Sequence, residues 1–187
     1  MAWSRRRVLV AMVIMVIIIT PTAKKIKNKR ARDNNLSESI LIVCVGNICR
    51  SPMGEYLFRK MSQESGEETR VSSAGLGALT GHGADALAIE VMREHGVNVS
   101  EHRARQLDEA LVKHNELILV MEVWQKNKIE QLYPFSKGRV HLLGKWDEIE
   151  ISDPYKMSKT HFIDAYEDIK QSCQQWCEKL YNHKVLI

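Results

Sequence analysis

The chain has 187 residues, 44% of them hydrophobic, which suits one domain with a buried core and an additional segment. Its four cysteines are too few for a secreted disulfide scaffold and lack the paired spacing of a structural zinc site. The net charge of +4 combines residues 1–36, with nine Lys/Arg and one acid, and a remainder with 18 basic and 22 acidic residues. Nucleic-acid-binding domains carry positive charge on the folded surface, so we expect no nucleic-acid partner.

Residues 1–36 stand apart from the rest of the chain as a basic and hydrophobic leader. Three arginines at 5–7 precede twelve apolar residues at 8–19, and a second basic stretch covers 24–32. A membrane-spanning helix needs roughly 20 apolar residues. Twelve is the length of the hydrophobic region of a signal peptide.

Export nevertheless fits this leader poorly. Ala23 is the plausible cleavage residue, but Pro21 occupies the position where a small residue is required, and positive charge tends to stay cytoplasmic. Two interpretations stay open ahead of export: a short anchor that contacts the membrane surface through residues 5–32, and a start codon assigned too far upstream. We therefore predict a domain at residues 37–187 in the cytoplasm, at the inner face of the membrane if the leader is present.

From residue 37 onward, predicted strands and helices alternate. The apolar run at 40–45 predicts a buried parallel strand, and Pro52 lies in the first turn of a predicted helix. This order predicts an α/β fold, a single doubly wound domain with a four-stranded parallel sheet flanked by helices. In such sheets ligands bind beyond the carboxyl ends of the strands. Further strands are predicted at 71–75, 116–121 and 139–143, and further helices at 85–95, 122–133 and 159–181.

The loop between the first strand and the first helix has the composition of an anion site. It reads Cys-Val-Gly-Asn-Ile-Cys-Arg-Ser-Pro from Cys44 to Pro52. Gly46 permits a positive φ angle and Asn47 tolerates one, so the loop can curl with its N–H groups pointing inward. Such a nest binds a tetrahedral dianion. The expected phosphate-binding residues are Val45, Gly46, Asn47, Ile48, Cys49, Arg50 and Ser51.

Two side chains of this loop indicate phosphoryl transfer. Cys44 ends the strand, so its sulfur is expected in the nest, where the field and a hydrogen bond from Ser51 favour the thiolate. Arg50 adds a planar fork of donors that suits two oxygens of one phosphoryl group. A lone cysteine is usually a small buried residue and a lone arginine a surface charge. The strand before and the Ser-Pro helix start after them favour a phosphate loop.

With these residues, the chain resembles the low-molecular-weight protein-tyrosine phosphatase family. Residues 43–52 resemble the family's signature, and the resemblance covers about residues 40–181. Ser73-Ala74-Gly75 matches its second-strand turn, and Asp153-Pro154-Tyr155 matches its general-acid loop. The order and spacing are similar to the bacterial branch, whose members often act beside capsule or exopolysaccharide tyrosine kinases.

The resemblance implies a phosphatase of phosphotyrosine proteins that needs neither a metal nor a cofactor. Cys44 is then the nucleophile, Arg50 the phosphate clamp, Asp153 the general acid and Tyr155 a wall of the cleft. By itself, Asp-Pro-Tyr would indicate only a turn. An autophosphorylating tyrosine kinase in polysaccharide production is an expected partner. The resemblance further implies a hydrogen-bond network of Asn47, Ser51 and Ser73 that shapes the loop.

Three alternative functions are compatible with a loop of this kind. Arsenate reduction needs further redox cysteines after the third strand, and residues 120–138 contain none. Bacterial enzymes that resemble phosphoarginine phosphatases usually carry Thr where this chain has Ile48, which favours phosphotyrosine. A non-catalytic phosphopeptide-binding module would need no general acid such as Asp153.

The remaining cysteines and the histidines receive weaker assignments. Cys49 is either a small buried residue or a partner that pairs reversibly with Cys44 under peroxide. Cys173 and Cys177, one helical turn apart, are expected to be structural. The histidines, among them His82, His95 and His102, show no metal-ligand spacing and are assigned no special role.

Overall fold

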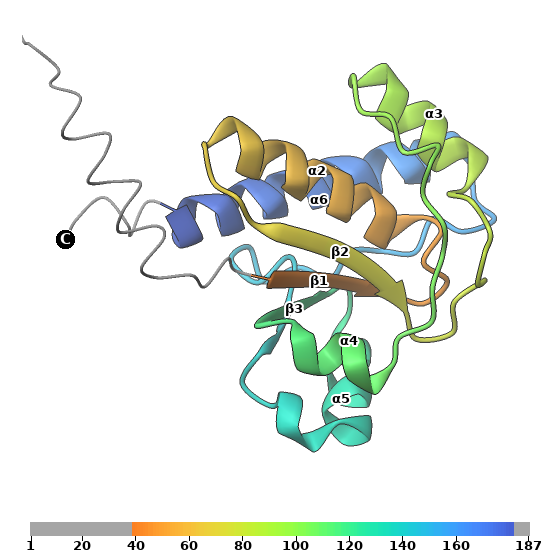
Figure 1. Cartoon of the computed structure of the whole chain (residues 1–187). Helices are drawn as coiled ribbons and strands as arrows, with labels where there is room; N and C mark the ends of the chain where they lie inside the picture. Colours follow the sequence, from red (N-terminus) through yellow and green to blue (C-terminus); the bar gives the residue numbers. More distant parts are fainter. Residues whose placement is uncertain (1–38, 182–187) are drawn as a thin grey trace, which may run out of the picture. The chain divides into compact units, whose positions relative to one another are not determined.

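The computed structural model describes residues 39–181, which fold around one parallel sheet (Figure 1). Its strands are β1 (Ser39–Cys44), β2 (Arg70–Gly75), β3 (Leu117–Val120) and β4 (Val140–Leu142). They pair in the order β2-β1-β3-β4, and every pair is parallel. The predicted doubly wound α/β fold with a four-stranded parallel sheet is confirmed.

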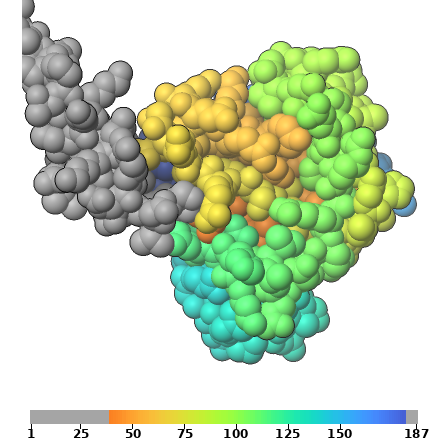
Figure 2. Space-filling view, in the orientation of Figure 1, coloured from red at the N-terminus to blue at the C-terminus, as the bar shows by residue number. Residues whose placement is uncertain are grey.

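The helices cover both faces of the sheet. In the space-filling view α2 and α3 lie on one side of the sheet, and α4 and α5 lie on the other (Figure 2). Helix α6 packs along α2 and α3 on the first side. Each predicted helix is present within a few residues of its predicted ends. The helices are α2 (Arg50–Glu64), α3 (Ala86–Glu94), α4 (Glu109–His114), α5 (Val123–Leu132), the 3₁₀ turn η1 (Pro134–Ser136) and α6 (Lys159–Tyr181).

One helix, α4, was not predicted. It has six residues, too few for an apolar stripe to repeat, and it buries only Val112. Asp108 starts it by accepting a hydrogen bond from the N–H of Leu111 at 2.7 Å. A capping residue before a short helix is a weak signal, and tertiary contacts decide whether the helix forms.

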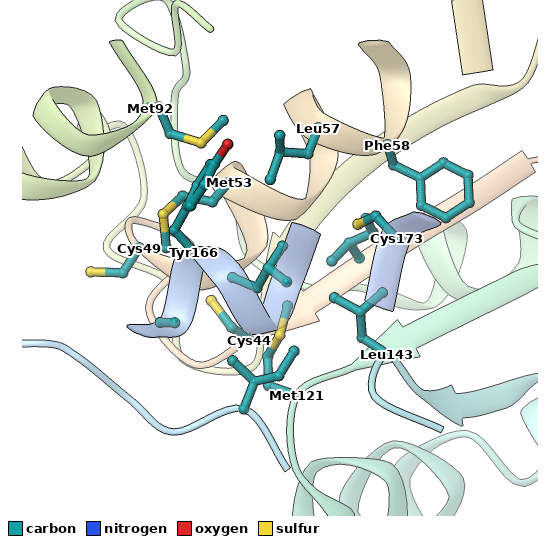
Figure 3. Packing of buried hydrophobic residues seen from close by; sticks show 14 of the residues in the cluster. Cys44, Cys49, Met53, Leu57, Phe58, Met92, Met121, Leu143, Tyr166 and Cys173 are labelled. Carbon is teal, nitrogen blue, oxygen red and sulfur yellow. The ribbon is translucent and has the colours of Figure 1, made fainter. Parts of the chain in front are cut away.

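The sheet separates two apolar clusters because successive strand residues point to opposite faces. One cluster, toward α2, α3 and α6, contains Ile40, Ile42 and Cys44, and Figure 3 shows part of it, with Cys44 near Met121 and Met53 on α2. The other, toward α4 and α5, contains Leu41 and Val43. Burial on both faces explains why β1 is an unbroken apolar run rather than an alternating one. Cys44 therefore ends a strand that is buried on both faces.

The leader predicted at residues 1–36, with its membrane-contact stretch at 5–32, lies outside the described residues, as do residues 182–187. Within residues 39–181, none of the helices combines the length and the apolar character that crossing a bilayer requires.

Candidate active site

The predicted phosphate loop lies where the strand order reverses. Strand β1 is flanked by β2 on one side and by β3 on the other, so its carboxyl end opens between two diverging connections. The loop from Cys44 runs directly into α2, which begins at Arg50. Gly75, at the end of β2, packs so closely that a Cβ there would meet the carbonyl oxygen of Val45 at 2.3 Å. A larger residue at Gly75 would push the loop out of place.

The sulfur of Cys44 takes part in two hydrogen bonds within its own loop. Its Sγ lies 2.9 Å from the hydroxyl oxygen of Ser51 and accepts from the N–H of Asn47 at 3.3 Å. Cys44 is almost completely buried. These two contacts hold the sulfur within the loop. The bond to Ser51 was predicted, whereas the backbone contact required the structure.

Asn47 braces the loop from behind. It is the loop residue with a positive φ, 55°, and the more permissive Gly46 does not adopt a positive value. Its side-chain amide donates to the hydroxyl groups of Ser51 at 2.8 Å and Ser73 at 2.9 Å. Its side-chain carbonyl accepts from the N–H of Arg105 at 2.9 Å. The predicted network of Asn47, Ser51 and Ser73 is therefore present.

Two further residues extend this network, and the sequence analysis missed both. Glu55, on α2, accepts a hydrogen bond from Ser73 at 2.6 Å. His102 is buried, and its Nε2 lies 2.7 Å from the carbonyl oxygen of Asn47. Burial lowers the pKa of His102, although the bond to Asn47 opposes that shift. A neutral imidazole that donates from Nε2 fits this position. No local motif marks His102, because the fold alone brings it to the loop.

Arg50 is held on three sides. Its Nη1 donates to Glu122 at 2.5 Å and to the carbonyl oxygen of Ile151 at 2.8 Å, and its Nη2 lies 2.6 Å from a carboxylate oxygen of Asp153. The side chain is only 1% exposed. Its Nε has no hydrogen-bond partner in the described part of the chain. Two donors, Nε and Nη2, could therefore serve a phosphoryl group while Nη1 stays anchored.

Asp153 and Tyr155 stand at the mouth of a pocket of about 160 Å³. Their side chains are 43% and 44% exposed. Asp153 is 109 positions from Cys44 in the sequence, yet Arg50 connects it to the loop. Leu79 forms a wall that the sequence analysis missed. The predicted site residues Cys44, Val45, Gly46, Ile48, Cys49, Arg50, Asp153 and Tyr155 all line the pocket, whereas Asn47 and Ser51 lie behind it.

The other cysteines are buried thiols. Burial raises the pKa of Cys49 above its ordinary value, and the neighbouring Asp85 adds to this effect. Burial raises the pKa of Cys177 to about 12 and that of Cys173 well above its usual range. These three residues are therefore thiols at neutral pH. In residues 39–181 the structure brings together no group of His, Cys, Asp and Glu side chains that could hold a metal ion.

Comparisons with known proteins agree with this geometry. The family model for "Low molecular weight phosphotyrosine protein phosphatase" matches residues 39–186. The chain is 44% identical over 143 residues to "Probable low molecular weight protein-tyrosine-phosphatase EpsP" from Ralstonia nicotianae, covering 76% of this chain and 96% of that protein. It is similar to the structure of Vibrio vulnificus Wzb in complex with benzylphosphonate, with a TM-score of 0.72, 42% identity and coverage of 76% and 98%. It is also similar to the YwlE arginine phosphatase from Geobacillus stearothermophilus, with a TM-score of 0.74, 27% identity and coverage of 79% and 96%.

Proposed function

Because the chain belongs to the low molecular weight phosphotyrosine protein phosphatase family and is a protein-tyrosine-phosphatase, we propose that it hydrolyses phosphotyrosine through a covalent phosphate on Cys44. One observation carries the proposal. The sulfur of Cys44, the guanidinium of Arg50 and the carboxylate of Asp153 line a single pocket. That pocket supplies a nucleophile, a clamp for the transferred group and an acid for the leaving group.

In the first step, Cys44 attacks the phosphorus of phosphotyrosine. The S–P bond forms as the bond between phosphorus and the tyrosyl oxygen breaks. The loop N–H groups and Arg50 bind the non-bridging oxygens and stabilise their charge. Asp153 donates a proton to the leaving tyrosyl oxygen, whose conjugate acid has a pKa of about 10. Tyr155 borders the path of the aromatic ring.

In the second step, the carboxylate of Asp153 accepts a proton from water as the water oxygen attacks phosphorus. The S–P bond breaks, inorganic phosphate forms, and Cys44 returns as a thiolate. The ion pair between Arg50 and Asp153 links phosphate binding to the position of the acid. A phosphoryl group that takes the Nη2 donor of Arg50 displaces Asp153 toward the leaving oxygen.

The chemistry of the pocket supports phosphotyrosine over phosphoarginine. Ile48 lines the pocket with an apolar side chain, and Leu79 and Tyr155 add further apolar and aromatic surface. These walls suit a phenyl ring. The overall fold does not discriminate, because the chain resembles the arginine phosphatase and the Wzb structure to a similar TM-score. We expect hydrolysis of phosphotyrosine peptides to exceed that of phosphoarginine by at least about 10-fold in kcat/KM, a difference of about 1.4 kcal/mol.

The finer biological role is also a proposal. We propose that the enzyme opposes an autophosphorylating tyrosine kinase in polysaccharide production, in the cytoplasm at the inner face of the membrane. The basic and hydrophobic residues at 5–32 support membrane contact. Intact mass of the native protein, combined with membrane fractionation, tests this location. A native protein that lacks the leader, or one that stays out of the membrane fraction, would contradict it.

The mechanism is tested by replacing the nucleophile. We expect Cys44→Ser to abolish hydrolysis of an aryl phosphate while inorganic phosphate still binds, because serine keeps the loop and is a poor nucleophile at neutral pH. The matched control is Cys177→Ser, a buried thiol in α6 that does not line the pocket. Wild-type activity should survive EDTA. An active Cys44→Ser, or loss of activity on chelation, would contradict the cysteine mechanism.

A further inference from the structure

Glu122, which anchors Nη1 of Arg50, occupies the N-cap position of α5. Its side chain makes no capping hydrogen bond to that helix. The residues that cap helices well are shorter, such as Ser, Asp and Asn, and their side chains bond to the first backbone N–H groups. The carboxylate of Glu122 instead accepts a hydrogen bond from Arg50 at 2.5 Å. The side chain at this position therefore serves the phosphate clamp and not the helix.

The two carboxylate oxygens of Glu122 have different partners. Oε1 accepts from Nη1 of Arg50 and, at 2.9 Å, from the side-chain amide of Gln125. Gln125 is fully buried and is itself held, because its side-chain oxygen accepts from the N–H of Met121 at 3.0 Å. Oε2 accepts from the indole N–H of Trp124 at 2.8 Å. The carboxylate is thereby fixed in one orientation, with a single oxygen bonded to Arg50.

Core packing does not account for Trp124. Its side chain is 47% exposed, and the residues that α5 buries are Gln125 and Ile129. The carboxylate that it contacts is more shielded, since Glu122 is only 23% exposed. A hydrogen bond to a charged group is stronger than one between neutral groups. The indole N–H therefore has a defined partner, one bond away from the phosphate clamp.

The orientation of Glu122 matters because Arg50 has to keep its other donors available. Carboxylates and guanidinium groups frequently pair through two parallel hydrogen bonds. If Oε2 of Glu122 also turned toward Arg50, it would take Nη2, the second donor at the end of the guanidinium. Nη2 is the donor that Asp153 holds, and the phosphoryl group is expected to take it over. A second bond from Glu122 would compete with both.

We propose that Trp124 is a positioning residue for Arg50: by holding Oε2, it keeps Glu122 on Nη1 alone and leaves Nη2 for the phosphoryl group. The inference rests on the proposed function, in which Arg50 binds the transferred group. Trp124 does not line the catalytic pocket, so it acts through Glu122 and not on the substrate. Its indole should therefore affect how tightly phosphate binds, and the turnover rate at saturating substrate should change little.

Two substitutions of Trp124 separate its hydrogen bond from its ring. Trp124→Phe keeps an aromatic ring and loses the donor. Trp124→His keeps a donor, because Nε2 of an imidazole occupies the place of Nε1 in the five-membered ring of the indole. The matched control is Trp146→Phe, at another exposed tryptophan. Calorimetric titration with inorganic phosphate measures binding at pH 8, where an imidazole with a pKa of about 6.5 is neutral. Steady-state kinetics on an aryl phosphate give KM and kcat.

Trp124→Phe should weaken phosphate binding by about 5-fold and raise KM to a similar extent, with kcat within about 2-fold of the wild type. Trp124→His and Trp146→Phe should bind phosphate as the wild type does. Unchanged phosphate binding in Trp124→Phe, or an equal loss in Trp124→His, would overturn the proposal.

A second variant assigns the effect to Glu122. In Glu122→Gln the amide oxygen can still accept from Arg50, but the amide nitrogen cannot accept a second N–H. Trp124→Phe should therefore have no effect on phosphate binding when it is combined with Glu122→Gln. An equal loss in both backgrounds would also overturn the proposal. None of these results would touch the proposed function, because wild-type activity and its loss in Cys44→Ser test that separately.

Discussion

The phosphate loop and the general-acid loop meet at one pocket but are built in opposite ways. In the phosphate loop, Asn47 and Ser51 are fully buried, and each of their side chains makes two or more hydrogen bonds. In the acid loop, Asp153 and Tyr155 are more than two-fifths exposed. The acid loop is anchored at Ile151, whose N–H donates to Met121 and whose carbonyl oxygen accepts from Arg50.

The difference follows from what each loop has to do. Oxyanion binding is effective when the donors are already in place, so the phosphate loop needs rigid support. A group that gives up a proton in one step and accepts one in the next has to approach two different oxygens. Asp153 makes few contacts of its own, and its ion pair with Arg50 is the main one that it must leave. The four predictions that follow test this contrast, in order of expected effect.

Removal of the acid should have the largest effect. Asp153→Asn should slow phenyl phosphate and phosphotyrosine by roughly 10²-fold or more, because their leaving groups have conjugate acids with a pKa of about 10. An aryl phosphate with a strongly acidic phenol should be transferred to Cys44 with much less loss. Hydrolysis of the phosphorylated enzyme still needs a base, so this substrate should give a burst of phenol followed by slow turnover.

Rapid-mixing kinetics on a series of leaving groups measure this effect. The matched control is Asp164→Asn, an exposed carboxylate on α6. A uniform loss across the series, without a burst, would mean that Asp153 only supports Arg50.

Removal of the brace should affect both stability and activity. Asn47→Ala deletes three side-chain hydrogen bonds of roughly 1 kcal/mol each and leaves a non-glycine residue at φ 55°. We expect a loss of about 2–4 kcal/mol in the free energy of unfolding and a fall of about 10-fold or more in kcat/KM. Denaturant titration and steady-state kinetics measure the two effects. Asn98→Ala, which removes one exposed side-chain bond, is the control. Full activity in Asn47→Ala would show that the loop does not need its brace.

Peroxide treatment tests whether Cys49 protects Cys44 in the phosphate loop. Peroxide should oxidise Cys44 to a sulfenic acid, which condenses with the thiol of Cys49 to a disulfide and releases water. A thiol reductant should then restore activity in the wild type and much less in Cys49→Ser. Cys177→Ser, another buried thiol, is the control. Activity recovered after a peroxide pulse is the measurement, and equal recovery in all three proteins would leave Cys49 as a structural residue.

The smallest effect concerns acid stability. His102 has a lowered pKa in the fold, caused first by burial, so below about pH 6.5 the unfolded chain binds more protons than the folded one. Its stabilising contribution is complete above the unfolded pKa and is lost as the pH falls toward the folded value. His102→Gln should therefore flatten the decline in the free energy of unfolding between pH 7 and pH 5. His82→Gln, at an exposed histidine, is the control. Identical pH profiles for His102→Gln and the wild type would refute the linkage.

The sequence by itself determined the local architecture of this protein. The unbroken apolar run of β1 and the alternation of strands and helices predicted a buried parallel sheet. The string from Cys44 to Pro52 predicted an anion loop, because these features depend on residues that are neighbours in the chain. The predicted ends of the strands and helices differ from the observed ones by one or two residues in most cases.

Only the tertiary structure decided which distant side chains support the loop. Glu122 and Asp153 share Arg50, and His102 reaches the carbonyl oxygen of Asn47 across 55 positions of sequence. The same holds for the edge-to-face contact of Trp146 and Trp176, which are 30 positions apart. A hydrogen bond or ring contact between distant residues leaves no periodic trace in the sequence. It arises because the parallel strands bring their connecting loops to the same two ends of the sheet.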